Sequence, residues 1–465
     1  MGKTPRFMIA APNSGAGKTT IVLALLSALQ NRGSAPVSFK CGPDYIDPMF
    51  HSTVLGTPSF NLDLFYTGAL TVRGLLLDHS DNSGVAVIEG VMGYYDGISG
   101  STGASSYELA GATGTPVILV VSAKGASISM AAMVNGFKEF RKPSMIAGVI
   151  LNDCSEALYK MLKVSLEIET GLKLLGYFPR LKECSIESRH LGLVTAADID
   201  GLKQKIELLG AQAEKSIDID ALLSIAGSAQ ILTDKLPAVD PIVLTKPRIA
   251  IAQDDAFCFY YADNLALLER LGAELVPFSP LHDKALPDRI NALYLGGGYP
   301  ELYAAVLSDN ISMRENLRNA INNRLPTLAE CGGFLYLHET LEDDQGAQHS
   351  MVGVFQGHGF KTSRLQRFGY ITLTANQDTF LCSSGDSIPA HEFHYWDTTL
   401  TGGNCVAQKP DGREWTCVNA SKTIFAGFPH LYFYGNPSFA ARFVQAAAGY
   451  KGADTIYGTN SAQIL

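Results

Sequence analysis

Apolar segments alternate with amphipathic segments along residues 6–180, and this pattern predicts strands and helices in turn. The predicted strands are the short apolar runs 6–12, 36–40, 84–90, 115–123, 145–152 and 174–179. Between them lie helical patterns such as TTIVLALLSALQNRG (19–33), which ends at Gly33, a residue type that commonly terminates a helix. Strands that alternate with helices form βαβ units, so the sequence predicts a parallel, doubly wound sheet.

A second alternating series begins at residue 248. Its predicted strands are 248–254, 274–280, 292–300, 326–333 and 423–433. The stretch 195–232 is predicted to be mostly helical, and the stretch 235–248 carries three prolines, which indicates a domain boundary. We therefore expect an α/β protein with two doubly wound domains. The expected parts are a first domain at 1–235, a linker at 236–247, a second domain at 248–450 and a polar tail at 451–465.

Composition narrows the class of protein. Hydrophobic residues make up 46% of the 465 residues and charged residues 17%, which is typical of a globular protein. The formal net charge of −9 argues against nucleic acid as a partner, although a local basic pocket is compatible with it. The eight cysteines include no CxxC pair, which favours reduced thiols. Because no apolar run approaches the roughly 18 residues of a membrane span, we expect a cytoplasmic protein without a membrane partner.

A glycine-rich segment, APNSGAGKTT (11–20), follows the first predicted strand and opens the first predicted helix. This is the setting of a GxxxxGK[ST] phosphate loop, although Pro12 stands where the first glycine belongs. Glycines let backbone N–H groups turn onto phosphate oxygens, Lys18 supplies positive charge, and the Thr19 hydroxyl suits Mg²⁺. The segment therefore predicts ATP and Mg²⁺ binding. The predicted ATP-binding residues are Asn13, Ser14, Gly15, Ala16, Gly17, Lys18, Thr19 and Thr20.

Polar side chains follow several of the predicted strands. Glu89 ends the strand 84–90, where a parallel sheet presents its ligands, and it is the first candidate for a Mg²⁺-binding acid. Asp44, Asp47 and Asp96 lie in loops nearby in the predicted fold, but each stands beside proline or glycine and is also suited to a turn. Asn152 ends another strand, where it either contacts an adenine edge or caps the strand.

The segment TLAECGGFLYL (327–337) predicts a strand, a sharp turn at Cys331 and a helix. A tight elbow of this kind exposes a nucleophile, whereas an isolated cysteine is more often a buried, inert thiol. Backbone N–H groups of Gly332, and of Gly297 or Gly298 in a second glycine turn, are candidates for an oxyanion hole. His430, far along the chain, is the candidate base.

The segment HEFH (391–394) contains two histidines and a glutamate, which are possible metal ligands. Its spacing is not that of HExxH, and no third ligand is evident, so zinc is rejected. A polar turn near the second site is expected instead.

Taken together, both halves resemble the cobyrinic acid a,c-diamide synthase family over nearly the whole chain. The segments that carry the resemblance are APNSGAGKTT, KCGPDYIDPMFH (40–51), VIEGVMGYYDG (87–97), SRHLGLV (188–194), YLGGGYPELY (294–303), AECGGFLYL (329–337), HEFHYW (391–396) and PHLYF (429–433). The resemblance implies a dethiobiotin-synthetase-like P-loop domain followed by a class I glutamine amidotransferase domain. It also implies that ammonia released from L-glutamine at Cys331 attacks carboxylates of cobyrinic acid that ATP has activated as acyl phosphates.

The resemblance also implies roles for individual residues. His430 is similar to the family's amidotransferase base, Asp47 and Glu89 to its metal-site acids beside Thr19, and Asp44 and Asp96 to acids near the reacting carboxylate. Tentative contacts to the tetrapyrrole, chosen only because they lie in matching segments, are Tyr45, Arg189 and His190. A homodimer is a further expectation.

One position departs from ordinary triad amidotransferases, which carry a Glu two residues after the His. Tyr432 stands there, as in the corrinoid branch of the family, so the group that orients His430 stays open. Three alternative functions also stay open. They are amidation of another tetrapyrrole (nickel sirohydrochlorin, sirohydrochlorin or hydrogenobyrinic acid), a partitioning-type P-loop ATPase, and a C-terminal half that is purely structural.

Overall fold

The computed structural model describes residues 4–81, 83–181, 184, 196–237, 239–243 and 245–452. The chain forms two compact units, Met1–Pro237 and Ala238–Leu465. The division between them lies inside the stretch 236–247 that the sequence predicts to be a linker. Val239 and Val243 pack against the core of the second unit, so part of that stretch is anchored there.

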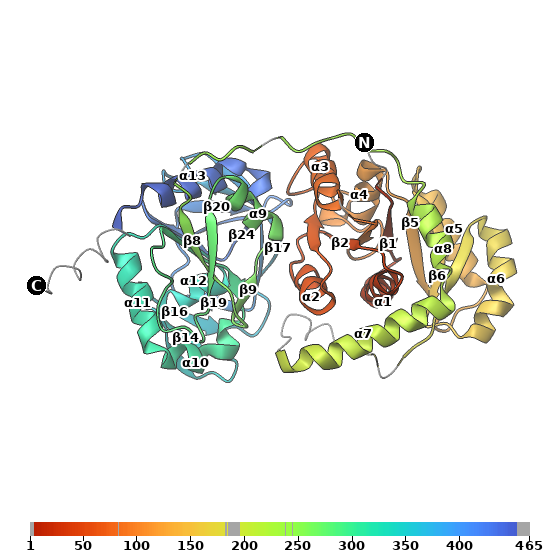
Figure 1. Cartoon of the computed structure of the whole chain (residues 1–465), viewed down its shortest axis with the longest axis horizontal. Helices are drawn as coiled ribbons and strands as arrows, with labels where there is room; N and C mark the ends of the chain where they lie inside the picture. The colour runs from red at the N-terminus through yellow and green to blue at the C-terminus, as the bar shows by residue number, and fades with distance from the viewer. Residues whose placement is uncertain are drawn as a thin grey trace, which may run out of the picture. The chain divides into compact units, whose positions relative to one another are not determined.

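The first unit contains a seven-stranded sheet in which all neighbouring strands run parallel (Figure 1). In sheet order the strands are β3 (Ser59–Leu62), β2 (Pro36–Cys41), β4 (Val85–Glu89), β1 (Arg6–Ala10), β5 (Val117–Ser122), β6 (Ile146–Asn152) and β7 (Lys173–Phe178). Its helices are α1 (Lys18–Asn31), α2 (Ile46–Leu55), α3 (Ala69–Ser80), α4 (Ser106–Thr113), α5 (Ser129–Phe140), α6 (Glu156–Thr170), α7 (Ala196–Ser216) and α8 (Ile219–Ala226). The predicted doubly wound sheet is confirmed, with β3 as an additional strand.

The strands of this sheet are buried on both faces. Every residue of β1 and β4 is buried, and Phe7 and Ile9 on one face of β1 pack in a core shared with α1, α7 and α8. Strands covered on both faces have nearly continuous apolar sequences, which is why the sequence pattern reveals them.

The second unit also has a mostly parallel sheet, in which only β22 at one edge is antiparallel. In sheet order the strands are β10 (Glu274–Phe278), β8 (Arg248–Ala252), β11 (Ala292–Leu295), β13 (Thr327–Glu330), β23 (Ile424–Gly427) and β22 (Asn419–Ala420). Its helices are α9 (Ala262–Arg270), α10 (Ala304–Asp309), α11 (Ile311–Asn322), α12 (Gly332–Tyr336) and α13 (Pro437–Gly449). The prediction of a second α/β domain is confirmed.

Antiparallel sheets that the sequence pattern did not predict complete the second unit. One has the order β15 (Gln348–Ser350), β14 (His338–Glu342), β16 (Phe355–Lys361) and β19 (Trp396–Thr398), with β14 and β16 running parallel. Another has the order β21 (Glu414–Cys417), β20 (Cys405–Gln408), β17 (Arg367–Ala375), β18 (Ser387–His394) and β24 (His430–Leu431). The short strands β12 (Gly297–Gly298) and β9 (Phe257–Phe259) form a third pair. The expected polar turn at HEFH is wrong, because β18 pairs with β17 along its whole length.

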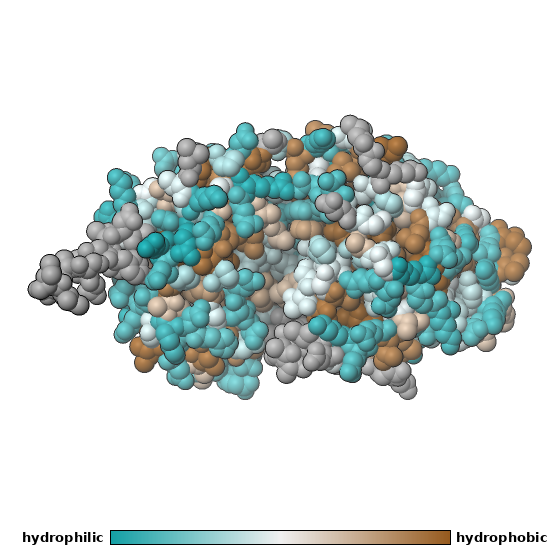
Figure 2. Space-filling view, viewed as in Figure 1, coloured by the Kyte–Doolittle hydropathy of each residue, from teal (hydrophilic) through white to brown (hydrophobic). Residues whose placement is uncertain are grey.

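Helix α6 presents an apolar stripe to the solvent. Met161, Val164 and Ile168 are 64%, 64% and 75% exposed, and Figure 2 shows brown, hydrophobic patches over this helix. An apolar stripe of this kind is a candidate contact surface. In the described ranges, no helix is both long and apolar enough to cross a lipid bilayer.

Candidate active sites

The predicted phosphate loop connects β1 to α1. Gly17, directly before α1, has a φ of 98°, and a Cβ there would lie 2.1 Å from Nδ2 of Asn152, so only glycine fits. The same Asn152 amide donates a hydrogen bond to the Ala16 carbonyl at 3.0 Å. In this conformation Asn152 therefore holds the loop in place, and its contact with adenine stays a prediction.

The side chains of the loop lie close to Glu89. The Thr19 hydroxyl donates to Oε1 of Glu89 at 2.6 Å, while the Lys18 ammonium donates to the carbonyl oxygens of Asn13 and Met92. Burial lowers the pKa of Lys18, and the nearby Lys40 ammonium lowers it further. An ammonium group that donates to carbonyl oxygens beside a glycine-rich loop suits an anionic ligand there.

Lys40, which has no predicted role, lies at the centre of the acids. It is the fifth residue of β2. Its Nζ lies 2.9 Å from Oε1 of Glu89 and 3.7 Å from Oδ2 of Asp44. The same ammonium group donates a hydrogen bond to Oδ2 of Asp47. Burial opposes a charge on Lys40, but the carboxylates of Glu89 and Asp47 raise its pKa well above the usual value. The signal in the sequence is a lysine near the end of an otherwise buried strand, where an unpaired charge is costly.

The three acids differ in their pKa shifts. Burial raises the pKa of Glu89, and it raises the pKa of Asp44 to about 6. Burial acts in the same direction on Asp47, but the Lys40 ammonium prevails and lowers its pKa. Oε2 of Glu89 is buried and has no hydrogen-bond partner in the part of the chain that the structure describes. An open carboxylate oxygen beside the Thr19 hydroxyl and Asp47 is a donor set that fits Mg²⁺, which takes few protein ligands together with phosphates and water.

Asp44 and Asp96 also serve turns, as their neighbours in the sequence indicate. Oδ1 of Asp44 accepts hydrogen bonds from the N–H groups of Ile46 (2.9 Å) and Asp47 (3.2 Å), and Oδ2 of Asp96 accepts one from Gly93 N–H at 3.0 Å. The turn uses only one carboxylate oxygen of Asp44, because the other, Oδ2, lies 3.7 Å from Nζ of Lys40. Both acids are therefore held rigidly near the loop.

Lys40→Met is expected to lower the free energy of unfolding of the first unit by about 3 kcal/mol, because it leaves buried carboxylates without their cation. The loss should be smaller at about pH 5 than at about pH 8, since Asp44 and Glu89 take up protons as the pH falls and their mutual repulsion then disappears. Calorimetric or denaturant unfolding of the full chain at both pH values measures this.

The matched control for this change is Lys173→Met. Lys173 forms a half-exposed pair with Asp218 at 2.9 Å, so its loss should cost less than about 1 kcal/mol at either pH. Equal losses in the two variants, or a larger loss for Lys40→Met at the lower pH, would contradict a charge-balancing role of Lys40.

In the second unit, Cys331 occupies the predicted elbow. It lies between β13 and α12 with φ 47° and ψ −104°, a strained conformation for a residue other than glycine, and its N–H donates to the Gly427 carbonyl at 2.8 Å. The side chain is 7% exposed, and burial raises the pKa of the thiol. A proton acceptor is therefore needed to generate the thiolate.

His430 is the predicted acceptor. A Cβ at Gly297 would lie 2.4 Å from Cε1 of His430, so the glycine turn is pressed against the imidazole. A Cβ at Gly332 would lie 3.0 Å from the backbone nitrogen of Gly298, so this turn also meets the residue after Cys331. Burial lowers the pKa of His430 to about 3, so the imidazole is neutral. The structure thus brings together the elements that the sequence singles out.

The strand with HEFH lies next to this site. His391 is directly opposite His430 in the pairing of β18 with β24. His391 Nδ1, Glu392 Oε2 and His394 Nε2 are buried and lack hydrogen-bond partners among the described residues. Within the same part of the chain, no set of three His, Cys, Asp or Glu residues is arranged to hold a metal ion.

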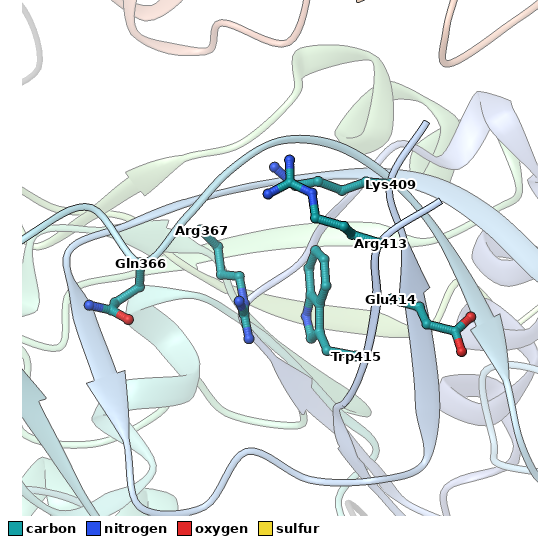
Figure 3. A pocket seen from close by; sticks show the side chains of 6 residues that line it. All are labelled: Gln366, Arg367, Lys409, Arg413, Glu414 and Trp415. Carbon is teal, nitrogen blue, oxygen red and sulfur yellow. The ribbon is translucent and has the colours of Figure 1, made fainter. Parts of the chain in front are cut away.

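A hollow of about 280 Å³ opens elsewhere on the same antiparallel sheet (Figure 3). Its lining residues are Gln366, Arg367, Lys409, Arg413, Glu414 and Trp415. The Arg367 guanidinium lies 4.4 Å from the centre of the Trp415 ring, and Arg413 pairs with Asp411 at 2.6 Å. Arg367 and Lys409 form no ion pair among the described residues, although the carboxylates of Asp411 and Glu392 act on Lys409. In a chain of net charge −9, this local excess of positive charge favours anions.

Of the tentative contacts to the tetrapyrrole, Tyr45 is buried at the start of α2. Arg189 and His190 lie outside the described residues.

Two parallel α/β units, one with a phosphate loop and one with a Cys–His elbow, define the class of ATP-dependent amide ligases that use glutamine. Residues 7–194 match the model of the CobQ/CobB/MinD/ParA nucleotide binding domain, and residues 248–438 match that of the CobB/CobQ-like glutamine amidotransferase domain. Proteins named cobyrinate a,c-diamide synthase from Listeria innocua, Caldanaerobacter subterraneus and Salmonella typhimurium are similar, with identities of 41%, 37% and 40%. The matches cover 93%, 96% and 95% of this chain and 97%, 98% and 98% of the relatives. The chain therefore belongs to the cobyrinate a,c-diamide synthase family.

Proposed function

We propose that this protein uses ATP and L-glutamine to convert the a and c side-chain carboxylates of cobyrinic acid into amides, as a step of cobalamin biosynthesis. The observation that carries the proposal is that one chain holds both a Cys331–His430 elbow and a phosphate loop surrounded by acids. The names of the relatives support the choice of macrocycle. Neither site alone accounts for amide synthesis, since a carboxylate must be activated and ammonia must be supplied.

In the second unit, the Cys331 thiol gives its proton to Nε2 of His430, and the sulfur attacks the side-chain amide carbon of glutamine. The C–N bond breaks, and the proton on His430 moves to the departing nitrogen, which leaves as ammonia. Water hydrolyses the γ-glutamyl thioester to glutamate and regenerates the thiol. Backbone N–H groups of Gly297, Gly298 and Gly332 stabilise the oxyanion of each tetrahedral intermediate.

In the first unit, the phosphate loop (Asn13 to Thr20) and Lys18 hold the phosphates of ATP, and Asn152 contacts the edge of the adenine ring. Thr19, Asp47 and Glu89 would hold Mg²⁺, which supplies positive charge to the transferring phosphoryl group. A side-chain carboxylate of the macrocycle attacks the γ-phosphoryl group of ATP, ADP leaves, and the carboxylate becomes an acyl phosphate. Ammonia then displaces inorganic phosphate to give the amide.

Further roles follow from proximity to these groups. Asp44 and Asp96 lie where they can orient the reacting carboxylate or accept protons from ammonia. Tyr45, Arg189 and His190 lie in segments that match the family, and we assign them to the tetrapyrrole. A homodimer stays a prediction, and the exposed apolar stripe on α6 is the candidate interface. Light scattering would measure whether a charged residue in this stripe lowers the molar mass in solution.

A panel of macrocycles tests the proposal. The purified protein is incubated with Mg²⁺, ATP and glutamine together with cobyrinic acid, hydrogenobyrinic acid, sirohydrochlorin or nickel sirohydrochlorin, and the products are analysed by mass spectrometry. Cobyrinic acid should gain two amides while the other macrocycles react slowly. Amidation of a sirohydrochlorin but not of cobyrinic acid would overturn the choice of substrate.

A further inference from the structure

The residue that follows His430 by two positions is engaged away from the imidazole. The hydroxyl of Tyr432 donates to Oδ2 of Asp263 at 2.8 Å, and both side chains are buried. This position therefore does not supply the carboxylate that an imidazole base needs behind it. The carboxylate therefore has to come from elsewhere in the second unit.

Glu330 is a carboxylate that does lie beside the imidazole. It ends β13 directly before Cys331, and its Oε2 is 3.9 Å from Nδ1 of His430. Glu330 is 3% exposed and His430 is 1% exposed, so solvent screens their interaction only weakly. Nδ1 is the nitrogen on the far side of the ring from Nε2, which is the proposed proton acceptor.

The position of Glu330 is fixed by two hydrogen bonds. Oε1 accepts from the N–H of Leu431 at 3.0 Å, and Oε2 accepts from the hydroxyl of Tyr294 at 2.9 Å. Because Leu431 directly follows His430, the first bond ties the carboxylate to the backbone that carries the imidazole. Two donors and the Nδ1 edge of His430 thus converge on one carboxyl group, an arrangement suited to its ionised form.

We infer that Glu330 is the positioning residue of the second site. It accepts the Nδ1 hydrogen of His430, so that Nε2 carries no hydrogen and can take the Cys331 proton, and its negative charge stabilises the imidazolium that forms. The inference rests on the proposed glutaminase function. The separation of 3.9 Å is longer than a hydrogen bond, and contacts of this kind commonly tighten when substrate binds.

Burial and hydrogen bonding act on the Glu330 carboxyl group in opposite directions. Burial raises the pKa of Glu330 to about 8, and the hydrogen bonds from Leu431 and Tyr294 oppose that rise. A positive charge on His430 favours the carboxylate further. The proton of Cys331 stays on His430 until it moves to the leaving nitrogen, so no proton has to reach Glu330.

Two substitutions test the inference, one that keeps the size of the side chain and one that keeps its charge. Glu330→Gln keeps the size and can still accept from Leu431 and donate to Tyr294, but it has no charge. Glu330→Asp keeps the charge but is shorter. A positioning role predicts a kcat for glutamine hydrolysis about 100-fold lower in E330Q, with a smaller loss of about tenfold in E330D and KM nearly unchanged. A purely structural role predicts the reverse order.

Amidation from ammonium salts provides the internal reference, since it needs only the first unit and should be unchanged in both variants. Asp263→Asn is the matched control, because it neutralises another buried acid that accepts from a tyrosine, and it should leave glutamine hydrolysis near normal. E330Q as active as E330D, or loss of ammonia-dependent amidation in both, would overturn the inference. Absence of glutamine hydrolysis in the unmodified protein would instead overturn the proposed function and this inference with it.

Discussion

Cys331→Ala is expected to lower glutamine hydrolysis at least about 10⁴-fold, because the thioester has no other nucleophile from which to form. Amidation from ammonium salts should persist near the unmodified rate, since it bypasses the second site. The measurement compares glutamate release, and amide formation from each nitrogen source, in the full chain.

Cys382→Ala is the control, since this thiol is also buried in the second unit but lies in the core around the antiparallel sheet. It should retain glutamine hydrolysis. If Cys331→Ala still hydrolysed glutamine, or if an electrophilic glutamine analogue labelled another residue, the assignment of the nucleophile would be wrong. Loss of ammonia-dependent amidation as well would indicate that Cys331 supports the fold.

Glu89→Gln should impair amide synthesis and spare glutamine hydrolysis, the opposite of Cys331→Ala. Amidation is expected to fall by about 10³-fold or more with either nitrogen source, while glutamine hydrolysis continues. The change removes the charge that meets Lys40 and Thr19, and it replaces one carboxylate oxygen with a donor in a site proposed to hold Mg²⁺. Rates of ATP cleavage and amide formation at several Mg²⁺ concentrations measure the effect.

Glu167→Gln serves as the comparison, because Glu167 is another hydrogen-bonded acid of the first unit but lies on α6. It should behave like the unmodified protein. Equal loss of amidation and of glutamine hydrolysis in Glu89→Gln would contradict the assignment of the two reactions to separate sites.

The first unit illustrates what could be predicted from sequence. Its strands are buried on both faces, so their apolar runs stand out, and the phosphate loop is a contiguous motif with a strand before it and a helix after it. Lys40 illustrates the opposite case. A lysine in an apolar strand signals a buried charge that needs partners, but the sequence does not say which, because only the fold gathers the three acids around it.

The second unit shows the same contrast. The sequence by itself determined the strand–elbow–helix around Cys331, because glycines and apolar runs encode it locally. The antiparallel sheets, the strand at HEFH and the meeting of Gly297, His430 and Glu330 were decided only by tertiary structure. Pairing between strands far apart in the chain depends on the partner strand and its register, and no local pattern of residues specifies either. What the sequence determined are the chemical groups, and what the folded chain decided is which of them face one another.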